Sequence, residues 1–204
     1  MIEHLNENEL KVATKLIFDG LSMAKSSMEQ ILQSPISIEK IEYDGNDLGV
    51  KRFFNEKVGS VHLIKTELMG DLKGTSHLIF SETEVSRLYK ACLPDSIISD
   101  ESNESKLMKM GFLSEIDNMV AAAVITEFSN FLGIEIYGMV PSLKVLEATE
   151  VNEYLADESK DYDSVVHFKA VFHGKELDIS PDFVWVFQNK FVDKIKDLVS
   201  VDQG

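Results

Sequence analysis

A glutamate and an asparagine stand three residues apart in segment 111–118, GFLSEIDN. The segment has a helical pattern, and residues three apart on a helix share one face, so Glu115 and Asn118 present a carboxylate and an amide side by side. Further along this face, Ala122 and Thr126 are small enough to let another molecule approach. A Glu-x-x-Asn pair also occurs often by chance, so a docking surface and two ordinary solvated residues both remain open at this point.

Several familiar catalytic patterns are absent from the sequence. It has no Walker loop, no nucleophile elbow and no His-Glu-x-x-His segment. The five histidines are scattered, so we expect structural or solvated side chains and no metal site. The single cysteine, Cys92, cannot form an internal disulfide, which suits a reducing compartment.

Length, charge and hydropathy set the broad class. The 204 residues are 44% hydrophobic, which is enough to bury a core as one large domain or two small ones. The net charge of −15 would repel nucleic acid and anionic membranes. Segment 1–10 is acidic and polar where a signal peptide is basic and then apolar, and no run approaches membrane-spanning length. We therefore expect a cytoplasmic protein whose partners include neither nucleic acid nor a membrane.

Hydrophobic spacing predicts two long helices. Apolar residues recur at three- and four-residue steps over 9–33 and again from 113 to 132, the spacing of one helix face. The other expected elements are strands at 36–43, 59–69 and 74–80, a helix at 81–92 capped by Ser81, a linker at 94–105, a strand at 134–139, a polar loop around 157–163, strands at 165–172 and 177–187, and a helix at 188–199.

The order of these elements suggests an internal duplication. Each half reads as long helix, strand, two-strand hairpin and short helix, and an offset of 100 residues pairs Leu16 with Ile116 and Met28 with Phe128. We expect a single domain over 1–204 made of two pseudo-repeats, at about 1–95 and about 101–204. The predicted class is α+β, with duplicated units that share one sheet rich in antiparallel strands and with both long helices on one face.

The helical pair also fits a known motif. The sequence resembles the CheC, CheX and FliY phosphatases of bacterial chemotaxis, whose pattern is Asp or Ser, three residues, Glu, two residues, Asn, twenty-two residues, Pro. Glu115, Asn118 and Pro141 match this spacing. One position departs from it, because Gly111 stands where the family has Asp or Ser, and the neighbouring Ser114 cannot substitute at that helical position. The resemblance extends to the length, the duplicated plan, and segments 70–74 (GDLKG) and 132–136 (LGIEI).

The resemblance implies a phosphatase for the aspartyl phosphate of a CheY-like response regulator. In that reading Asn118 holds the attacking water in line and Glu115 contacts the regulator's active-site lysine, while Pro141 only supports the backbone. The regulator supplies Mg²⁺, and this chain binds no cofactor of its own. The first half carries no such motif, because Lys15 and Phe18 stand opposite Glu115 and Asn118, and Ile41 stands opposite Pro141. One active site per chain is expected.

Two alternatives remain beside this reading. The chain could be a non-catalytic CheC-like interaction module that binds a response regulator, a flagellar switch component or a CheD-like protein. It could also be a generic α+β scaffold on which the Glu and Asn are only solvated. A two-half chain can complete its sheet alone, so we expect a monomer.

Overall fold

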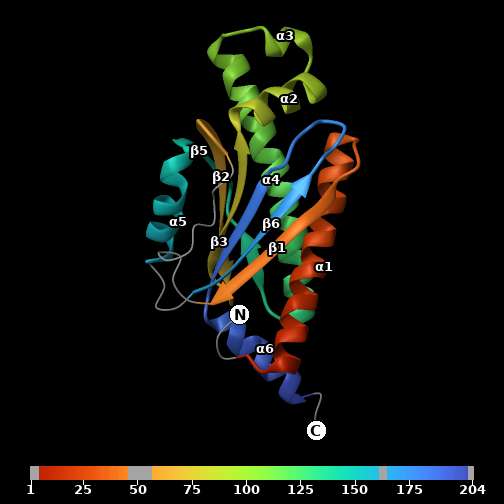
Figure 1. Cartoon of the computed structure of the whole chain (residues 1–204), viewed down its shortest axis with the longest axis vertical. Coiled ribbons are helices and arrows are strands. Elements are labelled where there is room, and N and C mark those ends of the chain that lie inside the picture. Colours follow the sequence, from red (N-terminus) through yellow and green to blue (C-terminus); the bar gives the residue numbers. More distant parts are fainter. Residues whose placement is uncertain (1–4, 46–56, 161–164, 202–204) are drawn as a thin grey trace.

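Two long helices lie side by side on one face of a single sheet (Figure 1). The computed structural model describes residues 5–45, 57–160 and 165–201. Helix α1 spans Glu7–Leu32 and helix α4 spans Asn103–Leu132, in agreement with the two apolar stripes of the sequence. The predicted α+β class with both long helices on one face is confirmed.

Within the described ranges the sheet contains seven strands, and every pairing between them is antiparallel. The strands are β1 (Ser37–Gly45), β2 (Ser60–Gly70), β3 (Gly74–Ser81), β4 (Ile136–Gly138), β5 (Ser142–Glu147), β6 (Val165–His173) and β7 (Asp182–Gln188). Their order is β1-β6-β7-β3-β2-β4, and β5 also pairs with β2, beyond the end of β4.

This order exchanges a strand between the two halves of the chain. Strand β1 pairs with β6 of the second hairpin, for example Ile41 with Ala170, while β4 pairs with β2 of the first hairpin, as Leu68 does with Gly138. The two hairpins meet in the middle, where β3 pairs with β7. Each half therefore completes the sheet of the other.

The burial pattern repeats along the two long helices. The buried positions of α1 and the following turn are 13, 16, 17, 20, 21, 24, 28, 32, 34 and 36, and each has a buried counterpart 100 residues later. Both helices also end on a left-handed residue, Gln33 (φ 49°) and Gly133 (φ 61°). The shared burial pattern and the shared helix end support the interpretation of two pseudo-repeats.

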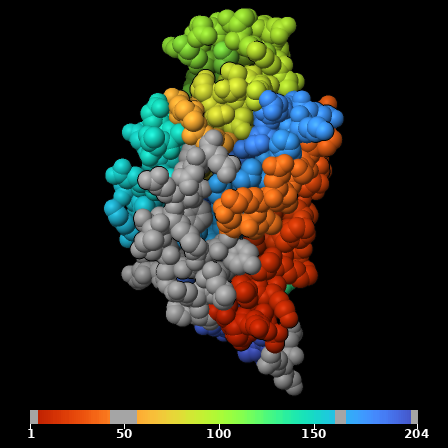
Figure 2. Space-filling model, in the orientation of Figure 1, coloured from red at the N-terminus to blue at the C-terminus, as the bar shows by residue number. Residues whose placement is uncertain are grey.

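The shorter helices close the ends of this layer and cover the other face of the sheet. They are α2 (Glu82–Cys92), α3 (Asp95–Ile98), the 3₁₀ turn η1 (Ala148–Glu150), α5 (Val151–Ser159) and α6 (Lys190–Val201). The predicted cap of α2 is confirmed, because the Ser81 hydroxyl accepts a hydrogen bond from the backbone N–H of Glu84 at 3.3 Å. Figure 1 shows α5 on the sheet face opposite the long helices, and in Figure 2 the residues of α2, α3 and the start of α4 (yellow to green) form one end of the molecule.

Three of the predicted segments were wrong, and β5 and α5 were not predicted. The linker expected at 94–105 contains α3 and the start of α4, because the Asp100 carboxylate accepts hydrogen bonds from the hydroxyls of Ser102 and Ser105 and Ser102 caps the helix. Part of the loop expected at 157–163 belongs to α5, and its residues 161–163 lie outside the described residues. The last strand begins at residue 182 instead of 177.

Two hydrophobic clusters hold the layers together. The larger one lies between the sheet and the long helices, where the ring centroid of Phe128 on α4 is 5.6 Å from that of Phe187, and Phe168 stacks on Trp185 at 5.9 Å. The smaller cluster, on the opposite face, joins α5 to residues of β2, β3 and β7. Because successive strand residues point to opposite faces, one sheet serves both clusters.

Candidate functional site

Glu115 and Asn118 lie on the exposed face of α4. The buried face of the same helix carries Leu113, Ile116, Val120, Val124 and Phe128, which pack against α1 and the sheet. This packing turns the carboxylate and the amide towards the surface.

The predicted docking residues share the exposed face of α4 with this pair. Ala122 and Thr126 are both exposed, and the Thr126 hydroxyl donates a hydrogen bond to the Ala122 carbonyl at 2.8 Å, so this hydroxyl already has a partner within the helix. The structure thus places Glu115, Asn118, Ala122 and Thr126 on one helical surface.

Pro141 does not lie on the helix but on the neighbouring edge of the sheet. Leu68 of β2 pairs with Gly138, and Lys65 of β2 pairs with Ser142, so residues 66–67 face residues 139–141. The outer side therefore has one residue more than β2 between these two pairs, and half-buried Pro141 ends this stretch directly before β5. Pro141 thus lies on the edge of the sheet beside α4.

Helix α4 and the adjacent sheet edge of β4 and β5 carry most of the exposed large hydrophobic side chains. Eight of the eleven among the described residues fall between 107 and 145: Leu107, Met108, Met110 and Met119 on α4, Tyr137, Met139 and Val140 along and after β4, and Val145 on β5. Met110 and Val145 line one hollow of about 700 Å³ between α2, α4 and β5. Flexible methionines and exposed apolar groups are typical of a surface that binds another protein. This exposed apolar surface was not predicted, although its methionines stand in the sequence.

A buried carboxyl group lies behind the pair, and sequence analysis did not single it out. Asp117 is fully buried on the sheet-facing side of α4, where the Thr66 hydroxyl of β2 donates to its Oδ2 at 2.6 Å. Burial raises the pKa of Asp117 to about 7, although the hydrogen bond from Thr66 acts in the opposite direction. Position 117 corresponds to Ile17 in the first half, so the offset of 100 residues was the signal that could have revealed its burial.

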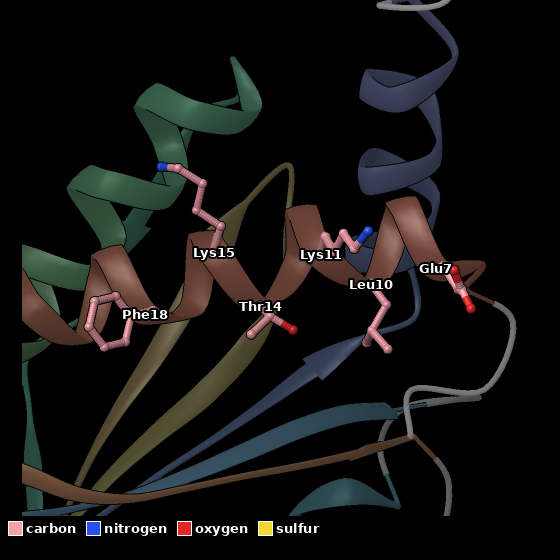
Figure 3. A pocket seen from close by; sticks show the side chains of 6 residues that line it. All are labelled: Glu7, Leu10, Lys11, Thr14, Lys15 and Phe18. Carbon is pink, nitrogen blue, oxygen red and sulfur yellow. The ribbon is translucent and has the colours of Figure 1, made fainter.

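The corresponding exposed face of α1 in the first half lacks the carboxylate and the amide of Glu115 and Asn118. Lys15 and Phe18 are exposed on α1, and together with Glu7, Leu10, Lys11 and Thr14 they line a shallow hollow of about 730 Å³ (Figure 3). Lys15 extends towards α4, pairs with Asp19 and lies 5.9 Å from the ring centroid of Phe131. Ile41, opposite Pro141, is a half-buried residue of an unbroken part of β1. The structure thus places a cation and a phenyl ring where the second half has a carboxylate and an amide.

Among the described residues, no group of three or more His, Cys, Asp or Glu side chains could hold a metal ion. Within the same ranges, no helix has the length and apolar character needed to cross a membrane.

The arrangement of the long helices over an antiparallel sheet with exchanged strands is the CheC-like fold. A structure of Thermotoga maritima FliY has it, with TM-score 0.65, 19% identity, and 95% of this chain and 96% of that chain covered. The Borrelia burgdorferi CheX–CheY–BeF₃–Mg²⁺ complex matches with TM-score 0.57 and 13% identity, covering 84% and 97%. The FliM middle domain of Vibrio alginolyticus matches with TM-score 0.55 and 16% identity, covering 93% and 99%. No protein-family model matches the sequence, and no curated protein matches it.

Proposed function

We propose that this chain is a phosphatase that removes the phosphoryl group from the aspartate of a CheY-like response regulator. The observation that carries the proposal is the position of Glu115 and Asn118, which lie side by side on the exposed face of α4. The match of this pair and Pro141 to the motif spacing, and the exposed apolar side chains on α4 and the adjacent sheet edge, add support.

The chemistry requires little from this chain. An aspartyl phosphate is an activated acyl phosphate, and the regulator's own Mg²⁺ and lysine neutralise the phosphoryl oxygens, so the main task left is to place a water molecule in line with the leaving group. The Asn118 amide can accept and donate hydrogen bonds to that water. Glu115 can form a charge-assisted contact with the regulator's lysine and so set the depth at which α4 inserts.

The surroundings of the pair suit insertion into a partner's active site. Side chains small enough for close approach, Ala122 and Thr126, continue the exposed face of α4. At Gly111, an added Cβ would have no heavy atom within 4 Å, so the helix is also open on the amino-terminal side of the pair. A CheX of the same fold has been seen in complex with a CheY, which makes a response regulator the natural first partner to test.

The test measures the decay of a phosphorylated CheY-like regulator with the wild-type chain, Glu115→Ala, Asn118→Ala and the control Asn130→Ala, which removes an exposed amide further along α4. We expect faster decay with the wild type and the control, and a loss of roughly a hundredfold in each site variant, the order seen when a positioned group is lost. If Asn118→Ala accelerates decay as the wild type does, the proposed role of the pair is wrong.

The second candidate is an interaction module without turnover. Gly111 favours this module, because the first position of the motif lacks its polar residue. The likeness to a FliM middle domain and to a FliM–SpeE complex favours it as well. A response regulator, a flagellar switch component and a CheD-like protein are the partners to examine. Measurable binding of the regulator with unchanged decay of its phosphoryl group would support this module over the phosphatase.

A further inference from the structure

The buried carboxyl of Asp117 has a specific place relative to the exposed pair. It lies between Glu115 and Asn118 in sequence but points to the opposite side of α4, where Thr66 of β2 is its hydrogen-bond donor. Its other oxygen, Oδ1, has no hydrogen-bond partner among the described residues. A side chain is thus held between helix and sheet by one directional bond at the same turn of the helix that presents the pair.

The first half of the chain provides an internal comparison. Ile17 occupies the corresponding position on α1, is 1% exposed and packs in the main core. The position therefore accepts an apolar residue, which would avoid the cost of burying a carboxyl group. The polar anchor occurs only in the half that carries the motif, which suggests a role connected with the motif rather than with folding.

Thr66 also links the helix to the sheet edge that carries Pro141. Its Cγ2 would lie 3.0 Å from a Cβ added at Gly138 of β4, and the same Cβ would lie 3.1 Å from Cδ1 of Ile125 on α4. Gly138 of β4 thus packs closely on Thr66 of β2 and on Ile125 of α4. A change in the Asp117–Thr66 bond would therefore shift α4 relative to the edge beside it.

We propose that the hydrogen bond between Thr66 and Asp117 is a positioning device that fixes the rotation of α4 on β2 and so aims Glu115 and Asn118, and that an ionised Asp117 carboxylate, with a single donor in reach among the described residues, draws water between α4 and β2 and so shifts the helix. This inference rests on the proposed phosphatase function. With side chains at roughly 6 Å from the helix axis, a rotation of about 10° moves them by about 1 Å. A misplacement of this size can reduce a rate by roughly a hundredfold.

The groups that face Asp117 determine how its charge responds to pH. By strand alternation, β2 presents His62, Ile64, Thr66 and Leu68 to the helices, and His62 is four residues away and pairs with Glu82 of α2 at 2.6 Å. The buried residues of α1 are apolar, and β4 contributes Ile136 and Gly138.

Burial is accordingly the main cause of the raised pKa of Asp117, about 7, and no neighbouring charge among the described residues opposes it. Above that pH the carboxylate would need more donors than the Thr66 hydroxyl supplies. The helix would then move to admit water, and the aim of the exposed pair would be lost.

The experiment measures kcat and KM for dephosphorylation of a CheY-like regulator. Asp117→Leu and Thr66→Val should each lower kcat tenfold or more with KM changed less than twofold, because the docking surface is intact. Asp117→Asn keeps a hydrogen-bond acceptor and Thr66→Ser keeps a donor, so both variants should retain the wild-type kcat. The control Thr75→Val removes a buried strand hydroxyl on the other sheet face and should leave kcat unchanged.

A pH series separates positioning from a purely structural role. The ratio of wild-type kcat to that of Asp117→Asn should fall at least threefold between pH 6 and pH 8, because only the wild type can ionise there; pH effects on the regulator itself cancel in the ratio. The inference would be overturned if Asp117→Leu and Thr66→Val both kept the wild-type kcat, or if the ratio of wild-type kcat to that of Asp117→Asn did not change with pH. Either result would leave the proposed phosphatase function intact. Thr66→Val keeps the test valid if Asp117→Leu fails to fold. An inactive wild type would overturn the proposed function and this inference together.

Discussion

The buried carboxyl of Asp117 makes a prediction about stability that does not depend on any activity. Its pKa is raised from 3.8 to about 7 in the folded chain, so the folded state binds more protons than the unfolded state between these values. The contribution of Asp117 to the stability of the fold is then greatest below about pH 4, falls as the pH rises towards 7, and levels off above it. The loss in unfolding free energy between these pH limits is roughly 4 kcal/mol, at about 1.36 kcal/mol for each pKa unit. Relaxation of the protein around the charge reduces this loss to roughly 2–4 kcal/mol.

The substitution Asp117→Asn isolates this contribution. Asparagine has nearly the same shape, can still accept from Thr66 and cannot ionise, so the variant should be more stable than the wild type by roughly 2–4 kcal/mol at pH 8. The advantage should shrink as the pH is lowered towards 4. Urea unfolding at several pH values measures it, with fluorescence of the single, fully buried Trp185 as the probe.

The difference between the two proteins is the decisive quantity, because other titrating groups contribute to both and cancel. A difference that stays constant from pH 5 to pH 8 would refute the reasoning, since it would mean that Asp117 titrates alike in the folded and unfolded chains. A wild type that gained stability over Asp117→Asn with rising pH would refute it as well, because the carboxylate would then be favoured by the fold.

Three further substitutions test the surface and the backbone. Gly111→Ser restores a residue type that the motif has there and meets open space, so we expect a gain in stability of about 0.5 kcal/mol and faster phosphoryl decay; an unchanged rate would show that this position does not contribute. Gly70→Ala should cost about 2 kcal/mol or more in urea unfolding, because φ is +109° and the new Cβ would lie 2.2 Å from the Glu135 carbonyl oxygen; wild-type stability would contradict this. Val140→Asp, at an 88% exposed position, should raise KM for the regulator roughly tenfold without changing the unfolding free energy; an unchanged KM would place docking elsewhere.

Strong periodicity explains which parts of the fold the sequence could predict. The apolar stripes of α1 and α4 are long and regular, so both helices were predicted within a few residues of their observed ends, apart from the start of α4. Strand β5 was missed because it is an edge strand with no buried residue, and therefore has no alternation of buried and exposed positions to detect. Helix α5 was missed because it is only nine residues long, too short for a clear apolar period, and it covers the sheet face opposite the long helices. The exchange of β1 and β4 joins residues more than 60 positions apart, which local patterns do not specify.

The candidate site was predictable in part because of the helical periodicity of α4. Helical geometry places Glu115 and Asn118 on the face away from the apolar stripe, and both are exposed on α4. Asp117 was overlooked because a carboxyl group between two polar residues reads as solvated. Its burial depends on β2, which lies some 50 residues earlier in the chain and supplies Thr66. Two patterns pointed to a buried position: the comparison with Ile17 across the repeat offset, and the helical spacing, which puts position 117 four residues after Leu113 and three before Val120.

The exchanged strands explain why a half without the motif can persist. Strand β2 of the first half is the strand against which β4, β5 and Asp117 of the second half are placed. The exposed pair on α4 is therefore positioned by residues of the other repeat, and the absence of a Glu and an Asn at positions 15 and 18 of α1 affects only a surface and not the scaffold beneath it. Selection for the site in the second half would preserve the packing of the first half while leaving its exposed face free to change. The close agreement of buried positions between the repeats, together with the disagreement at positions 15 and 18, is the pattern this constraint produces.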